Sequence, residues 1–432
     1  MRTSLALTGW FCIGVAAALA AEKPAAPAVP IEKLVEQLAS RNYREREAAS
    51  KALEARGETA LEPMRKAANT TKDPEARRRL QVLIANLERT VTLSPKRVTL
   101  KAQNQPIGNV VENLARLTGY QIQYQGGNRN QPVNLDFENR PFWEVLDRIC
   151  LMGGLTVQHN EGSGFQLYQN DVIWPHVSYQ GPFKLTANNF YYTRTVTLGG
   201  LPRNPAQQQT RGESLQFSFN IMSEPKLPLM QAQQAKLIEA VDDRGNSLMF
   251  PMSGNVETVY YGHNGYRTHN YSSQVQLAPP SKDARFVKVL RGSIPVTLLA
   301  EQKPEIVIDE ILKVKNKKFT GNETEIQIDE VKDNKTSFSI KMTVRNNAKN
   351  ANQDYSWTNS VHQRLELLDA KGNKYYSHGY NWENSSPANV SATFMFGTNG
   401  NAALGPPARL VYNQWSMMQH QIEFEFRDLP LP

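Results

Sequence analysis

The sequence predicts a multidomain protein with both helical and β-rich parts. Apolar residues in 31–90 have helical spacing, residues 97–168 contain an internal repeat, and the chain from about Val177 onward alternates short β-type segments with turn residues. These observations predict N-terminal helical hairpins, a duplicated βαβ module and two tandem antiparallel β-sandwich domains. The expected boundaries are 1–20 for a signal peptide, 21–30 for a Pro/Ala linker, 31–90 for the helices, 95–170 for the module, and 177–302 and 305–432 for the two β-sandwiches.

The N-terminus has the pattern of a secretory signal peptide. Arg2 precedes a largely apolar run over residues 5–20 that ends in Ala18-Leu19-Ala20, a small-x-small cleavage signal. This run is shorter than the roughly 20 residues that a membrane-spanning helix needs, and no later apolar run reaches that length. We therefore expect cleavage after Ala20, no transmembrane segment in the mature chain, and a periplasmic or secreted protein. The alternatives are an uncleaved anchor and lipid attachment at Cys12.

The charge and the cysteines constrain the partners and the compartment. The 432 residues carry a net charge of +8 without a dense block of lysine and arginine. A basic exported protein could favour anionic surfaces or polymers, although a mixed, solvated surface explains the same composition. We expect no nucleic-acid partner, because the chain lacks a basic stripe interleaved with aromatic residues. With Cys12 in the predicted signal peptide, Cys150 has no cysteine left to pair with, and we expect it to be a buried small side chain.

The segment 31–90 is predicted to be helical because its apolar residues recur at i, i+3, i+4 and i+7. They are Ile31, Leu34, Val35 and Leu38 at the start of the segment and Leu80, Leu83, Ile84 and Leu87 near its end. Gly57 and Pro74 stand where helix ends belong, which predicts about four short helices. The stretch NYREREAASKALEARGETALEPMRKA resembles a HEAT-type helical repeat. Since such arrays use three or more units to bury a continuous core, we expect these hairpins to lean on a neighbouring domain or partner.

Residues 97–168 contain two similar units offset by 35 positions, VTLKAQNQPIGNVVENLARLTGYQIQ and VNLDFENRPFWEVLDRICLMGGLTVQ. The matched pairs are Val98 with Val133, Leu100 with Leu135, Asn104 with Asn139, Pro106 with Pro141, Val110 with Val145, Gly119 with Gly154 and Gln123 with Gln158. Each unit predicts a strand, an Asn-x-Pro, a helix with an apolar stripe, a terminating Gly and a short strand.

This duplicated unit resembles the short N-terminal domain of secretins and TonB-dependent receptors. The two halves that carry the resemblance are LKAQNQPIGNVVENLARLTGYQIQY and LDFENRPFWEVLDRICLMGGLTVQHN. The resemblance implies a periplasmic module for protein contacts and not a catalyst. The remainder of the chain does not resemble the rest of those proteins, so we expect only the module to be shared.

Two short sequences recur in the β-rich region. AVDDRGNSL at 240–248 matches LLDAKGNKY at 367–375, and LAPPSKDARFV at 277–287 matches LGPPARLV at 404–411. The shared Asp-x-x-Gly-Asn predicts a hairpin, since Gly accepts positive φ and Asp and Asn bond to the backbone within turns. The repeated order of these elements resembles tandem immunoglobulin-like or fibronectin-like domains, with a boundary near Gln302 to Glu305.

Local catalytic and metal-binding motifs are missing from the sequence. It contains no His-Glu-x-x-His, Gly-x-Ser-x-Gly, P-loop or paired-cysteine metal motif. Ser223 and Lys226 match Ser-x-x-Lys, but Pro225 interrupts the helix that this motif requires. His263 and His269 would need a converging carboxylate to bind a metal, and a solvated polar loop is the simpler interpretation. We therefore predict no enzyme, no cofactor, and no catalytic, cofactor-binding or metal-binding residues.

Aromatic residues follow the hairpin sequence in each half of the β-rich region. They are interleaved with Gly, His and Asn, a composition that makes adaptable binding loops. The candidate ligand-contact residues are Tyr260, Tyr261, Tyr266, Tyr271, Tyr380 and Trp382. The alternative is that alternate aromatic side chains point into the β-sandwich while Gly and Asn turn the chain.

These features suggest three functions. The first, which we adopt, is an exported, non-enzymatic envelope protein whose modules bind another envelope protein or a cell-surface polymer. The second is an accessory subunit of a secretion or outer-membrane transport system that docks through the duplicated module. The third is an enzyme whose site is assembled from distant residues without a local motif.

Overall fold

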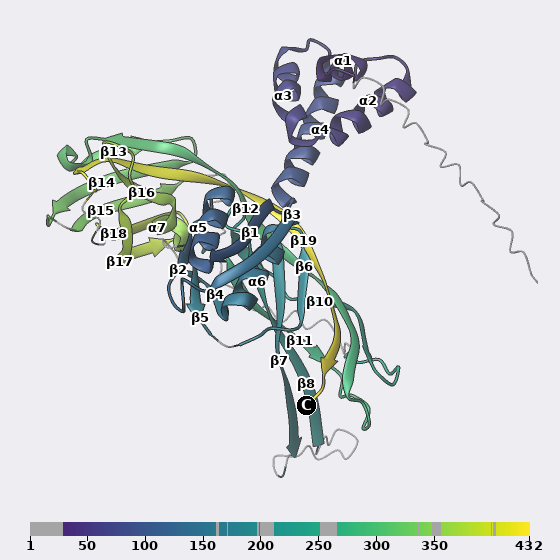
Figure 1. The fold of residues 1–432 in the computed structure, drawn as a ribbon. Coiled ribbons are helices and arrows are strands. Elements are labelled where there is room, and N and C mark those ends of the chain that lie inside the picture. The colour runs from purple at the N-terminus through teal and green to yellow at the C-terminus, as the bar shows by residue number, and fades with distance from the viewer. Residues whose placement is uncertain are drawn as a thin grey trace, which may run out of the picture. The chain divides into compact units, whose positions relative to one another are not determined.

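The computed structural model describes residues 29–160, 164–170, 172–196, 198, 211–250, 266–335, 337–347, 356–398, 400 and 403–432. The expected signal peptide and most of the linker lie outside these residues, as do Tyr260 and Tyr261. The chain forms two compact units, one ending at Val91 and one from Thr92 to Pro432 (Figure 1). The protein is a mixed α and β structure with several antiparallel sheets, as the sequence predicts at this level.

The first unit is helical. Its elements are α1 (Ile31–Gln37), α2 (Tyr43–Ala55), a 3₁₀ turn (Gly57–Ala60), α3 (Leu61–Thr70) and α4 (Pro74–Leu93). The backbone N–H of Arg44 donates to the Asn42 side chain at 3.0 Å, which caps the start of α2. Most of the apolar stripe found in the sequence is buried in one core that includes Leu34, Leu38, Leu80, Leu83 and Leu87. Among the residues that the structure describes, no helix combines the length and apolar character needed to cross a membrane.

The second unit begins with an α/β module. Its elements are β1 (Arg97–Pro106), α5 (Ile107–Thr118), β2 (Ile122–Tyr124), β3 (Pro132–Pro141), α6 (Phe142–Gly153), β4 (Leu155–Asn160) and β5 (Gly164–Gln169). Each predicted unit has its strand, helix and strand, and β5 follows the second unit. Strands β1 and β3 form one antiparallel sheet, and β2, β5 and β4 form another. Both helices contribute their apolar stripes to a core shared with these sheets.

The internal repeat of the module is also a repeat of backbone geometry. Asn104 and Asn139 both adopt the left-handed conformation, with φ of 49° and 50°. The N–H of Asn104 donates to Asn134 Oδ1 at 2.8 Å, and the N–H of Asn139 donates to Thr99 Oγ1 at 3.1 Å. The pairing of β1 with β3 is interrupted by a β-bulge at each of these asparagines. Thr99 and Asn134 are themselves aligned by the 35-residue offset, so a side chain from each half accepts a hydrogen bond from the bulge of the other half.

The rest of the second unit is β-rich. Its strands are β6 (Val177–Gln180), β7 (Phe183–Val196), β8 (Arg211–Ser223), β9 (Leu229–Ala232), β10 (Lys236–Asp242), β11 (Asn270–Leu277), β12 (Phe286–Asp309), β13 (Lys317–Thr320), β14 (Thr324–Asp333), β15 (Ser337–Asn346), β16 (Leu365–Asp369), β17 (Tyr376–Ser386), β18 (Asn389–Gly397) and β19 (Pro407–Pro430). A 3₁₀ turn (Ile311–Lys313) follows β12, and α7 (Ser356–Arg364) precedes β16.

These strands form three antiparallel sheets around two cores. The outer sheets have the orders β11-β8-β7-β6 and β13-β14-β15-β18-β17. The central sheet has the order β10-β12-β19-β16, with β9 added beside β12. The first core joins the β11-β8-β7-β6 sheet to one part of the central sheet, and the second core joins the other outer sheet to the remaining part.

Strands β12 and β19 run antiparallel through both cores (Figure 1). The register pairs Phe286 with Pro430 at one end and Asp309 with Arg409 at the other. In the first core β12 pairs on its other side with β10, and in the second core β19 pairs on its other side with β16. The two copies of the β region therefore contain corresponding strands in the same order, which are β6-β7-β8-β10-β11-β12 in the first copy and β13-β14-β15-β16-β18-β19 in the second. The last strand of each copy, β12 or β19, contributes one half to its own core and the other half to the core of the other copy.

This arrangement differs from the expected boundary near Gln302 to Glu305. These residues lie inside β12, and residues 415–430 of β19 return to the first core, where Phe424 and Phe426 are buried. A long strand needs hydrogen-bond partners along its whole length, and β12 and β19 supply them to each other. Alternation of apolar residues along one strand does not identify the strand that pairs with it. A division of the chain at 302–305 therefore places all of β19 in the second β-sandwich, whereas its C-terminal half belongs to the first core.

The duplicated Asp-x-x-Gly-Asn sequences form the predicted hairpins. Asp242 Oδ1 accepts from the N–H of Asn246, and Asp369 Oδ1 accepts from the N–H of Asn373, both at 2.8 Å. The Gly of each turn has positive φ, 85° and 84°. Burial alone would raise the pKa of Asp242, but hydrogen bonds from Asn246 and Ser281 outweigh it and lower the pKa to about 2. The Asn373 side chain is the main cause that lowers the pKa of Asp369 to about 2.

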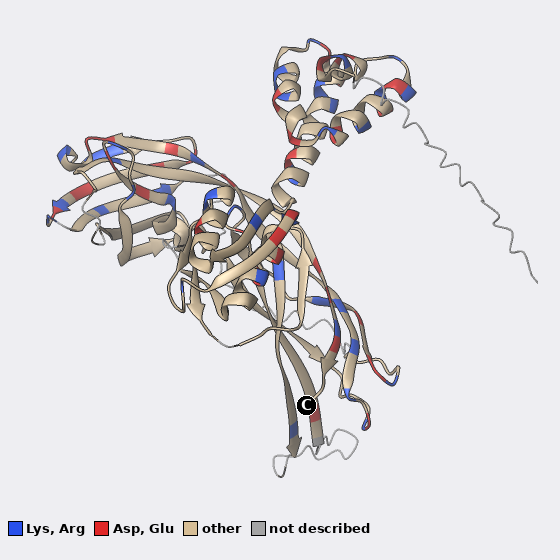
Figure 2. Ribbon diagram, in the orientation of Figure 1, with Lys and Arg blue, Asp and Glu red and all other residues tan. Residues whose placement is uncertain are grey.

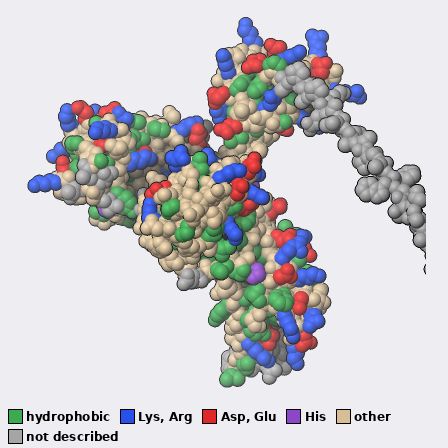
Figure 3. Space-filling model, viewed as in Figure 1, with side chains coloured by type: hydrophobic (Ala, Val, Ile, Leu, Met, Phe, Trp, Pro, Cys, Tyr) green, Lys and Arg blue, Asp and Glu red, His purple; other side chains and the backbone are tan. Residues whose placement is uncertain are grey.

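The charged side chains are dispersed. Lysine and arginine alternate with aspartate and glutamate over the N-terminal helices and over the strands (Figure 2). On the face drawn in Figure 3 the two signs remain interspersed, without a large field of one sign. The net charge of +8 is therefore spread over the surface and gives no extended cationic face in this view.

Candidate functional site

The tertiary structure brings three of the six candidate aromatic residues together. Tyr266 lies just before β11, whereas Tyr380 and Trp382 lie on β17, the outermost strand of its sheet. With His362 of α7 they form a group that we call the aromatic cluster. The cluster therefore joins residues from both copies of the duplicated β region.

Close ring contacts hold the aromatic cluster together. The His362 ring is 4.7 Å from that of Tyr380 and 5.8 Å from that of Tyr266, measured between centroids. The Trp382 ring meets Tyr380 edge to face, with centroids 4.8 Å apart and an interplanar angle of 87°. The hydroxyl oxygens of Tyr266 and Tyr380 are 3.5 Å apart.

One side of the aromatic cluster packs against the protein core, and the other side is exposed to solvent. Tyr380 packs against the second core, while Trp382 keeps 42% of its surface exposed. Around Trp382, strand β17 exposes the polar residues Asn381, Glu383 and Asn384, and Glu383 pairs with a lysine of β15 at 2.8 Å. An exposed indole held by a partly buried tyrosine and flanked by amides is suited to bind a ligand that has both apolar faces and hydroxyl groups.

The cluster itself carries no charge at neutral pH. Burial lowers the pKa of His362 to about 4, so the imidazole is neutral. The hydrogen bond with Tyr380 is the main cause that raises the pKa of Tyr266 to about 12. An uncharged ligand thus meets no desolvated charge in this group.

The candidate Tyr271 points inward, and so does Tyr375, which was not among the candidates. Tyr271 packs against the first core and donates its hydroxyl to the Ala232 carbonyl at 3.2 Å. Tyr375, beside β17, is buried in the second core and donates to the Gly405 carbonyl. For these two tyrosines the structure has the inward orientation that the sequence left as the alternative.

Residues 266–269 connect the aromatic cluster to the rest of the unit. The N–H of Arg267 donates to Gln363 Oε1 at 2.6 Å, and Gln363 Nε2 donates back to the Arg267 carbonyl at 3.3 Å. His269 contacts His159 of the α/β module, with ring centroids 4.4 Å apart. No local sequence motif marks His159, Arg267, His362 or Gln363, because these residues meet only across different sheets and helices.

The Ser-x-x-Lys sequence does not form a nucleophilic pair. Lys226 Nζ donates to the Ser94 carbonyl. Ser223 is fully buried, with its Oγ 3.2 Å from His269 Nδ1. A hydroxyl buried at the end of β8 is positioned for a structural hydrogen bond and has no access to a substrate.

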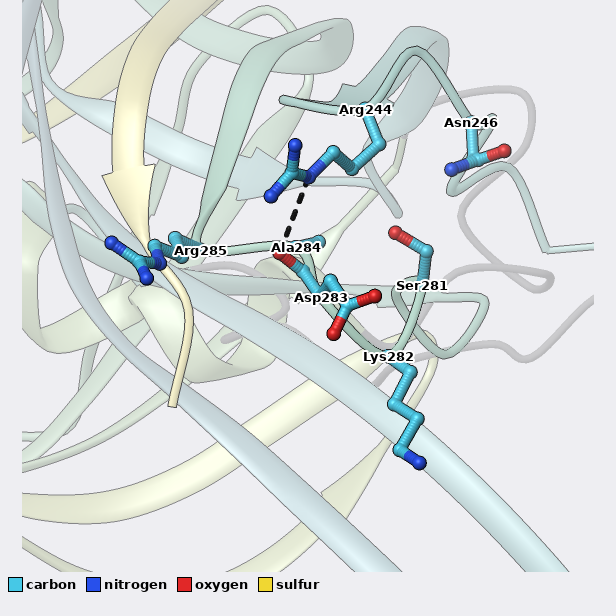
Figure 4. A pocket seen from close by; sticks show the side chains of 7 residues that line it. All are labelled: Arg244, Asn246, Ser281, Lys282, Asp283, Ala284 and Arg285. Carbon is cyan, nitrogen blue, oxygen red and sulfur yellow. Dashed lines mark hydrogen bonds between the residues drawn. The ribbon is translucent and has the colours of Figure 1, made fainter.

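A concave surface lies at the Asp242 hairpin, away from the aromatic cluster. It measures about 670 Å³ and is lined by Arg244, Asn246, Ser281, Lys282, Asp283, Ala284 and Arg285. Figure 4 shows that the Lys282 ammonium group points away from the guanidinium groups of Arg244 and Arg285. The Arg244 Nε donates to the Asp283 carbonyl at 3.3 Å. These cations do not converge on one ligand position, and this surface is better explained as the solvated end of the hairpin.

Metal and thiol chemistry have no visible centre in the described part of the chain. Within it, no three His, Cys, Asp or Glu side chains are grouped so that they could hold a metal. Cys150 is buried, and that burial raises the pKa of its thiol to about 12. A thiol with this pKa is protonated and unreactive at neutral pH.

Comparison with known proteins gives little further information. The chain matches no protein-family model, and no curated protein is significantly similar to it. A solved structure described as the conserved domain protein from Bacillus anthracis aligns with 62% of this chain and 91% of that chain, at 9% identity and a TM-score of 0.16. A similarity at this TM-score supports no statement about fold or function.

Proposed function

We propose that this protein is an exported, non-enzymatic binding protein of the cell envelope that contacts a cell-surface glycan through the aromatic cluster. The observation that carries the proposal is the exposed Trp382, supported by Tyr380 and surrounded by exposed amides on an edge strand. Sugar rings have apolar faces that stack on indole and hydroxyl groups that bond to amides. The neutral state of the cluster favours such an uncharged ligand over a charged one.

The proposed domain assignments are consistent with a binding role. We propose that residues 97–168 are a short N-terminal domain of the secretin and TonB-receptor type, and that the two β copies are immunoglobulin-like or fibronectin-like. The helices of the first unit are proposed to be HEAT-like. These are all modules that present surfaces to partners, and function must then come from a local site such as the aromatic cluster.

Binding to insoluble envelope glycan tests the proposal. Wild-type protein should co-sediment with the glycan, and Trp382→Ala should reduce the bound fraction at least fivefold. Trp174→Ala is the matched control, because Trp174 has the same 42% exposure but lies between β5 and β6, outside the cluster. Failure of the wild type to bind, or equal losses in both variants, would count against the proposal.

Export is tested separately on the native protein. We expect the mature chain purified from the envelope fraction to begin at Ala21, as measured by N-terminal sequencing. A chain that retains residues 1–20 and remains with the cytoplasmic fraction would refute this part of the proposal.

A further inference from the structure

A cavity of about 430 Å³ opens where the α/β module meets the first β copy. Both walls belong to the unit that spans Thr92 to Pro432. The module contributes Tyr120, Gln121 and His159, and the β copy contributes Lys226, Arg267 and His269. None of the residues of the aromatic cluster lines this cavity, although Arg267 directly follows Tyr266 in the chain.

The lining of the cavity is cationic. Lys226 and Arg267 contribute two positive charges, and no aspartate or glutamate is among the described residues that line it. The nearby Glu224 is fully buried behind the lining and does not itself reach the cavity surface. It accepts a hydrogen bond from the Tyr120 hydroxyl at 2.7 Å and another from the backbone N–H of Lys96 at 3.1 Å. Its charge acts on Lys226 and not on Arg267, so Arg267 is the cavity's less compensated cation.

Arg267 has the features of a ligand-binding guanidinium. Its backbone is fixed by both hydrogen bonds to Gln363, so the side chain starts from a defined position. Within the described part of the chain, no carboxylate forms an ion pair with its side chain. A guanidinium that is positioned, partly buried and without an acidic partner is suited to bind a planar or tetrahedral oxyanion in a bidentate manner.

The two histidines complete a polar but uncharged wall. His269 is only 7% exposed, and burial is the main cause that lowers its pKa to about 3. Burial likewise lowers the pKa of His159 to about 4, and the charge of Arg267 acts in the same direction on both. Neutral imidazoles can supply hydrogen bonds to a ligand without adding repulsion to the two cations.

We propose that this cavity binds a small molecule through a carboxylate or phosphate group, with Arg267 as the principal contact and Lys226 as the second cation. A volume of about 430 Å³ lies within the usual range for small-molecule sites. Because one wall comes from the module and the other from the β copy, the ligand bridges two parts of the same unit. Its binding should therefore stabilise the contact between them.

Titration calorimetry on the full-length protein tests the site with two probes, inorganic phosphate and succinate, against chloride at equal ionic strength. We expect saturable binding of at least one probe with a dissociation constant below about 1 mM, and a higher melting temperature in its presence. Binding of phosphate alone or succinate alone identifies the anion class. Binding of neither probe beyond the chloride baseline would overturn the proposal.

Two substitutions locate the binding. Arg267→Gln should weaken it at least tenfold, while Arg244→Gln, which alters the exposed hairpin surface, should leave it unchanged. If Arg267→Gln does not fold, Arg267→Lys decides the question. Lysine keeps the charge but loses the bidentate fork, so we expect affinity to fall at least fivefold. Unchanged affinity in the folded Arg267 variant, or an equal loss in Arg244→Gln, would show that the anion binds elsewhere.

Discussion

Replacing Phe426 with alanine tests whether the C-terminal strand stabilises the first core. Phe426 lies in β19, is 2% exposed, and contacts Phe217 and Phe219 of β8 with ring centroids 5.5 and 6.0 Å apart. Burying a phenylalanine removes roughly 150–200 Å² from water, which at about 25 cal/mol per Å² stabilises by about 4 kcal/mol. This value agrees with the roughly 3–5 kcal/mol that Phe→Ala changes cost in cores.

Hydrogen exchange measured by mass spectrometry locates the effect. A loss of about 4 kcal/mol corresponds to an increase of up to about 10³-fold in the exchange of amides that open with this core. We expect the increase in β7, β8 and β10, and little change in β14, β15 and β18. Phe394→Ala is the matched control, since Phe394 is also 2% exposed but belongs to the second core.

The two variants should therefore give opposite patterns of exchange. Phe394→Ala should open β15 and β18 while β7 and β8 stay protected. If Phe426→Ala instead opened the second core, the crossing of β12 and β19 between the cores would be refuted. Equal opening of both cores by both variants would show that the cores unfold as one cooperative unit.

Three further predictions concern single residues. Burial and the charge of Arg267 lower the pKa of His269 from 6.5 in the unfolded chain to about 3 in the folded protein. As the pH falls below 6.5, the unfolded chain therefore takes up a proton at this residue before the folded protein does. The contribution of His269 to stability is thus complete above pH 6.5 and declines by at most about 1.4 kcal/mol per pH unit below it, and His159 and His362, whose pKa values burial lowers to about 4, add to the decline. Urea titrations at pH 7, 6 and 5 should show this decline, with a smaller slope in His269→Phe, and a flat profile would contradict it. Cys150 should resist a thiol reagent in the native protein at pH 8 and react fully after denaturation; rapid native labelling would refute its burial. Gly119 and Gly164 have nearly the same positive φ, +74° and +73°. A Cβ added to Gly119 would have no atom within 4 Å, whereas a Cβ added to Gly164 would lie 2.4 Å from the Gln121 carbonyl oxygen. Gly119→Ala should cost about 1 kcal/mol in thermal unfolding and Gly164→Ala clearly more, and equal costs would contradict the close approach.

Local features of the fold were accessible from the sequence because they depend on a few neighbouring residues. The Asp-x-x-Gly-Asn turns form the same hairpin twice, since the Asp side chain and the Gly backbone determine the turn by themselves. Asn104 and Asn139 were aligned by the repeat, and their matching left-handed conformations follow from their equivalent positions. The apolar stripes of the helices are buried, because a helix of 3.6 residues per turn places them on one face.

The candidate site was accessible only in part. The composition of the loops selected Tyr266, Tyr380 and Trp382 separately, as aromatic residues among Gly and Asn. That they meet around His362, and that Trp382 alone keeps a large exposed surface among them, depends on how β17 and α7 pack. Tyr271 has the same sequence context but points into the first core, so context did not distinguish ligand contact from packing.

The sequence by itself determined the order of the elements, the two duplications and the local turn geometry. Only the tertiary structure decided that β12 pairs with β19 through both cores and that His159 meets His269. The physical reason is that backbone preferences and side-chain caps act over a few residues, whereas strand partners are selected by the burial of whole faces. The cationic cavity belongs to the second kind of feature, because Arg267 and His159 are brought together only by the packing of the module on the first β copy.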